Sequence, residues 1–114
     1  MNKEIKKEWV FALRSGQYKQ GRQTLHNQIE GTFCCLGVLC DIAVKAGLQI
    51  PVVNYSGITQ YADQQSLLPR AVKDWAGLDV MSPVCLKTEE HGQSGIAWLN
   101  DQAELSFKEL ANLI

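Results

Sequence analysis

The stretch Thr32-Phe33-Cys34-Cys35-Leu36-Gly37-Val38-Leu39-Cys40-Asp41-Ile42-Ala43-Val44-Lys45-Ala46-Gly47 decides the fold. Between Phe33 and Ala46 only two residues are charged, and apolar side chains occupy nearly every face of a helical wheel. A helix that is apolar all round is buried on several sides. We therefore predict a central buried helix from about residue 33 to 46, with Thr32 as its N-cap and Gly47 as the left-handed residue after its end.

Four other segments show helical spacing or helix-end signals. The segment Lys3–Arg14 carries an apolar stripe that includes Trp9, which we expect to anchor the core. A proline near its start and a glycine near its end mark Leu68–Leu78 as a short helix. The segment Gly95–Asn100 is apolar, and a Ser-x-x-Glu capping box precedes the segment Phe107–Ile114. The sequence thus predicts three to four further short helices around the central one.

Strand signals are short and lie on both sides of the central helix. Two segments flanking a turn, Gln23–His26 and Gly31–Phe33, are predicted to pair as a hairpin. The β-branched segment Leu48–Tyr55 contains a proline and is predicted to be an edge strand or an extended loop. We expect a surface loop over Ser56–Gln65 and another short strand over Val80–Leu86. The predicted fold class is α+β, a compact single domain over residues 1–114 with a small antiparallel sheet or hairpin.

The composition is typical of one globular domain. The chain has 114 residues, of which 46% are hydrophobic and 20% charged, and its formal net charge is −1. This charge argues against nucleic acid as a partner, and the longest apolar run is too short to cross a bilayer. Because charged residues stand where a signal peptide would be apolar, we expect the protein to stay in the cytoplasm.

The titratable residues give little support to catalysis. The four cysteines form no CxxC motif, so neither a metal site nor a cofactor is predicted, and the thiols are expected to be small core side chains. Cys34 is the one thiol worth testing, because a helix start lowers a thiol pKa. His26 and His91 lie in polar segments without a nucleophile motif. We therefore predict a protein that is not an enzyme.

The segment between the first helix and the hairpin is the best candidate for ligand binding. Arg14, Lys19 and Arg22 supply positive charge for a phosphate group. The ring of Tyr18 can stack on a base, and the side-chain amide of Gln20 can hydrogen-bond to a base edge. Two glycines would let backbone N–H groups approach an anion. The alternative is a solvated loop that follows a helix and binds nothing.

Asp41 completes the predicted ligand-binding set. A lone carboxylate on a buried helix is unfavourable, so we expect it to pair with Arg14, Arg22 or a backbone N–H group. A structural salt bridge is favoured over a role as a catalytic base, because buried charges are usually paired.

Several phrases of the sequence resemble one family when taken together. They are Trp9 with Ala12-Leu13-Arg14-Ser15-Gly16-Gln17-Tyr18-Lys19-Gln20-Gly21, then Phe33 to Asp41, Leu68-Pro69 with Trp75-Ala76-Gly77-Leu78, and Leu99-Asn100-Asp101 with Ser106-Phe107. In this order they resemble a widespread family of small uncharacterised proteins encoded by tailed phages and prophages. The resemblance implies a phage accessory protein that acts in the bacterial cytoplasm, and it implies no catalytic residues. The chain departs from that pattern at Gln102–Leu105, where family members usually have a glycine.

Two functions from different classes are compatible with these features. The first is a non-enzymatic binding protein that sequesters a small phosphorylated nucleotide, derived from a host immune signal, as an anti-defence sponge; assembly into a homo-oligomer is left open. The alternative is a protein–protein inhibitor or adaptor that acts on a host protein through an apolar patch around Tyr55, Ile58 and Tyr61. Membrane binding is not expected.

Overall fold

The computed structural model describes residues 2–78, 85–88 and 92–114. Within these residues the chain forms five helices and two sheets, so the predicted α+β class is confirmed. The helices are α1 (Lys3–Ser15), α2 (Cys35–Lys45), α3 (Arg70–Ala76), α4 (Ile96–Asp101) and α5 (Phe107–Leu113). The strands are β1 (Lys19–Gln20), β2 (His26–Asn27), β3 (Thr32–Phe33), β4 (Val52–Tyr55), β5 (Ile58–Tyr61), β6 (Cys85–Thr88) and β7 (Gly92–Gly95).

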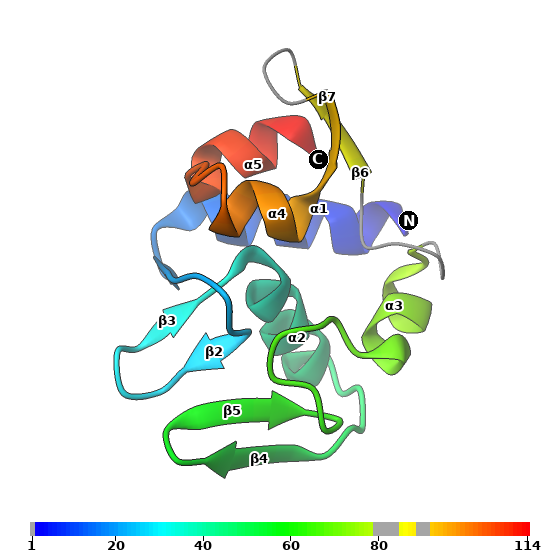
Figure 1. Ribbon diagram of the computed structural model, residues 1–114. Coiled ribbons are helices and arrows are strands. Elements are labelled where there is room, and N and C mark those ends of the chain that lie inside the picture. Colours follow the sequence, from blue (N-terminus) through cyan, green and yellow to red (C-terminus); the bar gives the residue numbers. More distant parts are fainter. Residues whose placement is uncertain (1, 79–84, 89–91) are drawn as a thin grey trace.

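Helix α2 lies at the centre of the fold, as its sequence predicts. Figure 1 shows it between the five-stranded sheet on one side and α1, α4 and α5 on the other. Most of its residues are buried, and Gly47 follows it with φ +100°, the predicted left-handed end. The predicted N-cap is wrong: the helix begins after Cys34, because Thr32 belongs to β3 and pairs with both β1 and β2.

Helix α1 packs into the core through a buried face that includes Trp9. The Asn2 side chain caps α1 by accepting hydrogen bonds from the N–H groups of Glu4 and Ile5. Trp9 is completely buried, and its indole N–H donates a hydrogen bond of 3.0 Å to the carbonyl oxygen of Cys35. An indole N–H needs such a partner when it is buried. The prediction that Trp9 anchors the core is thus confirmed.

The larger sheet has the strand order β1-β3-β2-β5-β4. The predicted hairpin is present, with His26 opposite Phe33 in an antiparallel pair. The sheet is mixed, however, because β1 runs parallel to β3. The prediction of a small antiparallel sheet therefore missed one strand. Strand β1 pairs with a segment more distant in the sequence, and no local pattern indicates this pairing.

The expected surface loop after residue 55 is wrong. Residues 58–61 form β5, which pairs with β4 through a tight turn at Ser56 and Gly57, where φ is +53° and +85°. Thr59 and Tyr61 of this strand are buried, and the alternate residues Ile58 and Gln60 are half-buried. Burial alternates along this strand, but the prediction missed this alternation because Thr59 and Gln60 are polar.

One predicted C-terminal feature is confirmed, and another lies mostly outside the described residues. The predicted capping box is present, since the Ser106 hydroxyl accepts from the Glu109 N–H and the Glu109 carboxylate accepts from the Ser106 N–H. The predicted strand over residues 80–86 lies mostly outside the described residues, as does His91. Strands β6 and β7 form a separate antiparallel pair that leads into α4.

Replacing Gly37 with alanine tests the packing of α2. A Cβ atom at Gly37 would lie 1.7 Å from the backbone oxygen of Leu25, so α2 or the Leu25 segment must move. We expect Gly37→Ala to lower the free energy of unfolding in urea by about 3 kcal/mol, the upper range for overpacking. The control, Gly31→Ala, has φ +69° with open space around it and should lose about 1 kcal/mol. Equal losses would contradict the close contact.

Candidate functional site

Three polar side chains, Tyr18, Asp41 and Lys45, meet between the sheet and α2. The Tyr18 hydroxyl donates to Asp41 Oδ2 at 2.5 Å, and Lys45 Nζ lies 2.9 Å from the same oxygen. Lys45 Nζ also lies 5.6 Å from the centre of the Tyr18 ring, in cation–π range. The expectation that Asp41 pairs with Arg14, Arg22 or a backbone N–H is wrong, because an i,i+4 lysine and a tyrosine take its oxygen. Burial raises the pKa of Tyr18, and the nearby Asp41 carboxylate raises it further.

Aromatic rings continue this cluster along the inner face of the sheet. The edge of Tyr18 meets Phe33, with ring centres 5.1 Å apart, and Phe33 stacks on His26 at 3.9 Å. His26 Nδ1 lies 3.1 Å from the Thr59 hydroxyl, so the histidine is half-buried within a contact network. Burial lowers the pKa of His26, while the Asp41 carboxylate opposes that shift. Tyr18 and Asp41 therefore connect the sheet to α2, and their polar groups already have hydrogen-bond or ion-pair partners within the protein.

Gln20 belongs to a second polar group, which we call the amide latch: Gln20, Asn100 and Asp101. The Gln20 Nε2 group donates to Asn100 Oδ1 and to the Leu105 carbonyl, each at 2.8 Å, and its Oε1 accepts from the Phe107 N–H. Asn100 is completely buried and donates to the carbonyl of Gly21 and to Asp101 Oδ1. The latch fastens the segment after α1 to the start and end of the α4–α5 connection.

The three predicted cations remain at the surface. Arg14 donates a hydrogen bond of 2.9 Å to Asn112 on α5, while Lys19 and Arg22 are exposed and have no recorded partner in the described part of the chain. The structure thus brings Tyr18 and Asp41 together, places Gln20 in the amide latch, and leaves Arg14, Lys19 and Arg22 outside both groups. From the sequence, Asn100 and Asp101 were expected to form a turn; the contacts of Asn100 with Gln20 and Gly21 were not predicted, because these partners come from the other end of the chain.

A different group of cations lies along the solvent-facing side of α1. They border an open groove of about 610 Å³. The residues that line this basic groove recur at i, i+3, i+4, i+7, i+8 and i+11, which places them on one helix face: Lys3, Lys6, Lys7, Val10, Phe11 and Arg14. Phe11 is 73% exposed, although it is a large aromatic residue. Arg14 is the one residue shared with the predicted site.

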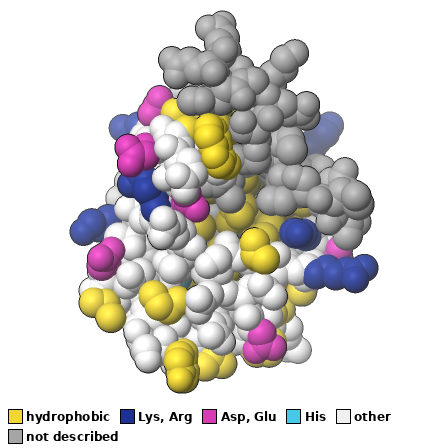
Figure 2. Space-filling model, in the orientation of Figure 1, with side chains coloured by type: hydrophobic (Ala, Val, Ile, Leu, Met, Phe, Trp, Pro, Cys, Tyr) yellow, Lys and Arg dark blue, Asp and Glu magenta, His cyan; other side chains and the backbone are white. Residues whose placement is uncertain are grey.

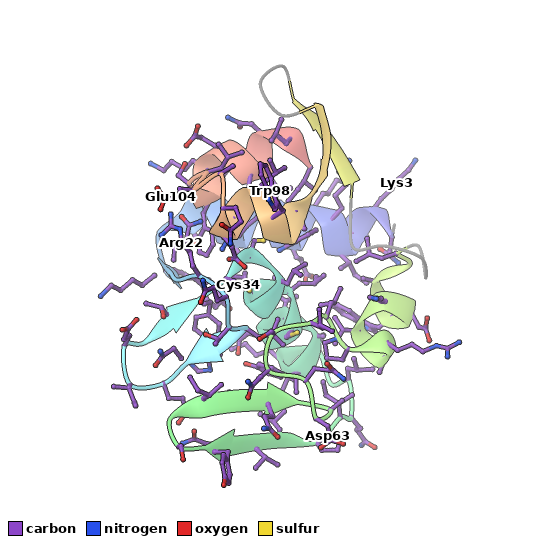
Figure 3. All side chains as sticks on the ribbon, viewed as in Figure 1. Lys3, Arg22, Cys34, Asp63, Trp98 and Glu104 are labelled. Carbon is purple, nitrogen blue, oxygen red and sulfur yellow. The ribbon has the colours of Figure 1, made fainter. Side chains whose placement is uncertain are left out.

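In the described part of the chain, one ion pair involves a cation of the basic groove. Lys7 Nζ lies 3.9 Å from the Glu4 carboxylate, and both side chains are exposed. Pairs of this kind contribute little to stability. Figure 3 shows Lys3 and Arg22 on opposite sides of the molecule, so the Lys3 end of the groove lies far from Arg22, while Arg14 belongs both to the groove and to the predicted loop site. The sequence feature that could have revealed the basic groove is the position of Val10 and Phe11 on the same helix face as Lys3, Lys6 and Lys7.

The thiols of Cys34, Cys35 and Cys40 are withdrawn from solvent. Burial raises the pKa of Cys34 to about 11, although the N–H groups of Gly37 and Leu36 lower it in part. The expectation that the helix start would activate Cys34 is wrong, because desolvation outweighs these hydrogen bonds. Burial also raises the pKa of Cys35 and of Cys40. Among the residues that the structure describes, no three His, Cys, Asp or Glu side chains are arranged to hold a metal ion.

The amide latch can be tested by removing its buried asparagine. Asn100→Ala leaves one Gln20 N–H and the Gly21 carbonyl without their partner, so we expect a loss of about 2 kcal/mol in the free energy of unfolding. The matched control, Asn112→Ala, removes an exposed asparagine and should change stability by less than about 0.5 kcal/mol. The latch would be unimportant if both variants unfolded at the same urea concentration.

The burial of His26 predicts a pH dependence of stability. Its folded-state pKa lies below the unfolded value of 6.5, so the unfolded chain binds more protons as the pH falls. Stability is therefore full above pH 6.5 and decreases on acidification below it. We expect the free energy of unfolding to fall between pH 7.5 and pH 5.5 by less in His26→Gln than in the native protein. An equal decrease in the free energy of unfolding in the two proteins would exclude His26 as the cause of the pH dependence.

Comparisons with known proteins place the chain in a family without assigning an activity. None of the described helices has the length and apolar character needed to span a membrane. No curated protein and no solved structure gives a significant match. A family model matches the whole chain, residues 1–114. The protein therefore belongs to the family described as Domain of unknown function (DUF8296).

Proposed function

We propose that this protein is a non-enzymatic binding protein that sequesters a small phosphorylated nucleotide in the basic groove of α1. The observation that carries the proposal is the grouping of four cations and an exposed aromatic ring on one helix face. The groove volume of about 610 Å³ is within the usual range of small-molecule sites. Phosphate groups would pair with the cations, and a base would stack on Phe11.

The position of the lysines supports an anionic ligand. Lys3, Lys6 and Lys7 lie in the first two turns of α1, where the helix dipole is positive and basic side chains are disfavoured. They also repel one another, since i,i+3 and i,i+4 neighbours of like charge destabilise a helix. A bound phosphate would relieve both effects. Arg14, at the other end of the groove, has a planar group that can bind a second phosphate oxygen pair.

The proposed biological role is based on the resemblance to phage and prophage proteins. A phage accessory protein in the bacterial cytoplasm would gain from removing a nucleotide-derived immune signal of its host. Sequestration needs stoichiometric binding and no chemical step. This fits the described residues, in which the Cys34 thiol is buried and His26 is half-buried in an aromatic stack.

Titration calorimetry with matched variants tests the site. The ligands are a panel of cyclic and ADP-ribose-type nucleotides, with inorganic phosphate as the minimal probe. We expect at least one nucleotide to bind, and Lys6→Gln/Lys7→Gln to weaken its binding about tenfold or more, since each charge-assisted contact contributes about 1.5–3 kcal/mol. The control, Lys19→Gln/Arg22→Gln, removes the same charge from the predicted loop and should leave the affinity unchanged.

One further variant tests base stacking, and three other outcomes would contradict the proposal. Phe11→Ala should weaken binding of the nucleotide but not of inorganic phosphate, because only the nucleotide has a base to stack. A loss of affinity in the Lys19/Arg22 variant alone would move the site to the loop. Binding of no nucleotide in the panel would remove the proposed function. Recovery of a chemically altered nucleotide after incubation would show an enzyme instead.

A further inference from the structure

Exposed apolar side chains gather at the end of the molecule opposite α1. Among the described residues, three of the seven large hydrophobic side chains that remain exposed belong to β4: Val52, Val53 and Tyr55. Hydrophobic atoms are visible over the β4–β5 hairpin at the lower end of Figure 2. Apolar groups that cluster in this way on a small protein are typical of a protein interface.

Strand β4 is also the edge of the five-stranded sheet. The hydrogen bonds with β5 show which of its residues direct their backbone N–H and C=O groups outward. Strand β4 pairs with β5 on one side only. The Ala62 N–H donates to the Pro51 carbonyl at 2.7 Å, so Pro51, Val53 and Tyr55 direct their backbone groups toward β5. Because these directions alternate in an antiparallel pair, Val52 and Asn54 direct their N–H and C=O groups outward. The missing N–H of Pro51 falls on the β5 side and does not block the outer edge.

The charge distribution selects the occupant of this edge. Exposed edges are usually protected by charged side chains, but residues 46–62 contain no Asp, Glu, Lys, Arg or His. A second copy of this chain would therefore bring no like charges together at β4. The basic groove of α1, in contrast, would repel its own copy.

We propose that two copies of the protein pair through antiparallel β4 strands about a twofold axis. The axis passes beside Val53, which faces Val53 of the partner subunit, and Val52 faces Asn54 of the partner subunit. This register uses both outward-facing residues of each copy, and each Val52–Asn54 pair exchanges two N–H···O bonds. Two five-stranded sheets then join into one continuous sheet.

This arrangement leaves the proposed ligand site open. Figure 1 shows β4 and α1 at opposite ends of the fold, with α2 between them. The dimer would thus present two separate basic grooves, and its existence does not depend on nucleotide binding.

Sedimentation velocity over a range of protein concentrations tests the dimer. We expect the native protein to sediment as a dimer at high concentration and Val53→Lys to remain a monomer, because two lysines would face each other at the axis. The matched control, Leu67→Lys, makes the same kind of change at another exposed apolar residue, which is 70% exposed, and should still dimerise. Circular dichroism checks that each variant is folded.

Cysteine cross-linking tests the register. Directly opposed residues that are not hydrogen-bonded have Cα atoms about 4.5 Å apart, which suits a disulfide. Under mild oxidation Val53→Cys should form a covalent dimer on a non-reducing gel, whereas Val52→Cys and the native protein should not. A native protein that stays monomeric at every concentration would overturn the proposal. So would a Val53→Lys variant that dimerises normally, or a dimer that Val52→Cys links and Val53→Cys does not.

Discussion

The burial of most of α2 is the constraint on which the rest of the structure depends. One helix can be enclosed only if other elements approach its backbone closely, and Gly37 allows the Leu25 carbonyl to do so. On another side, the Trp9 indole reaches the Cys35 carbonyl and fixes α1 against α2. The helix thus positions both the sheet that ends in β4 and the helix that carries the basic groove.

The polar residues within this packing serve the fold rather than a ligand. Asp41 is shared by Tyr18 and Lys45, and Gln20 makes three hydrogen bonds within the amide latch and its surroundings. In the described part of the chain, no buried side-chain nitrogen or oxygen lacks a hydrogen-bond partner. A new ligand at these groups would have to break existing bonds, and their replacement would offer little net free energy. Binding is therefore favoured where side chains are exposed and poorly paired.

Much of the fold was predictable because its signals are local. An apolar stripe located α1, a long apolar run located α2, and the Ser106–Glu109 capping box located the start of α5. The errors came where a distant segment competes with a local preference. Thr32 is a good helix cap, but two strands pair with it, so the helix begins later. The candidate site fared less well: of its six residues, the structure places only Arg14 in the basic groove.

The sequence by itself determined the α+β class, the central helix and several helix ends, because hydrogen bonds and side-chain spacing within a few residues specify them. Only the tertiary structure decided which polar side chains remain available. Gln20 and Lys6 are both polar in the sequence, yet the first is held by Asn100 and the second faces solvent beside a groove. Likewise, Pro51 favoured an edge strand or an extended loop over Leu48–Tyr55, but only the tertiary structure shows that β4 is an edge strand paired with β5 alone. These outcomes depend on contacts between residues far apart in the chain, and only folding brings such residues together.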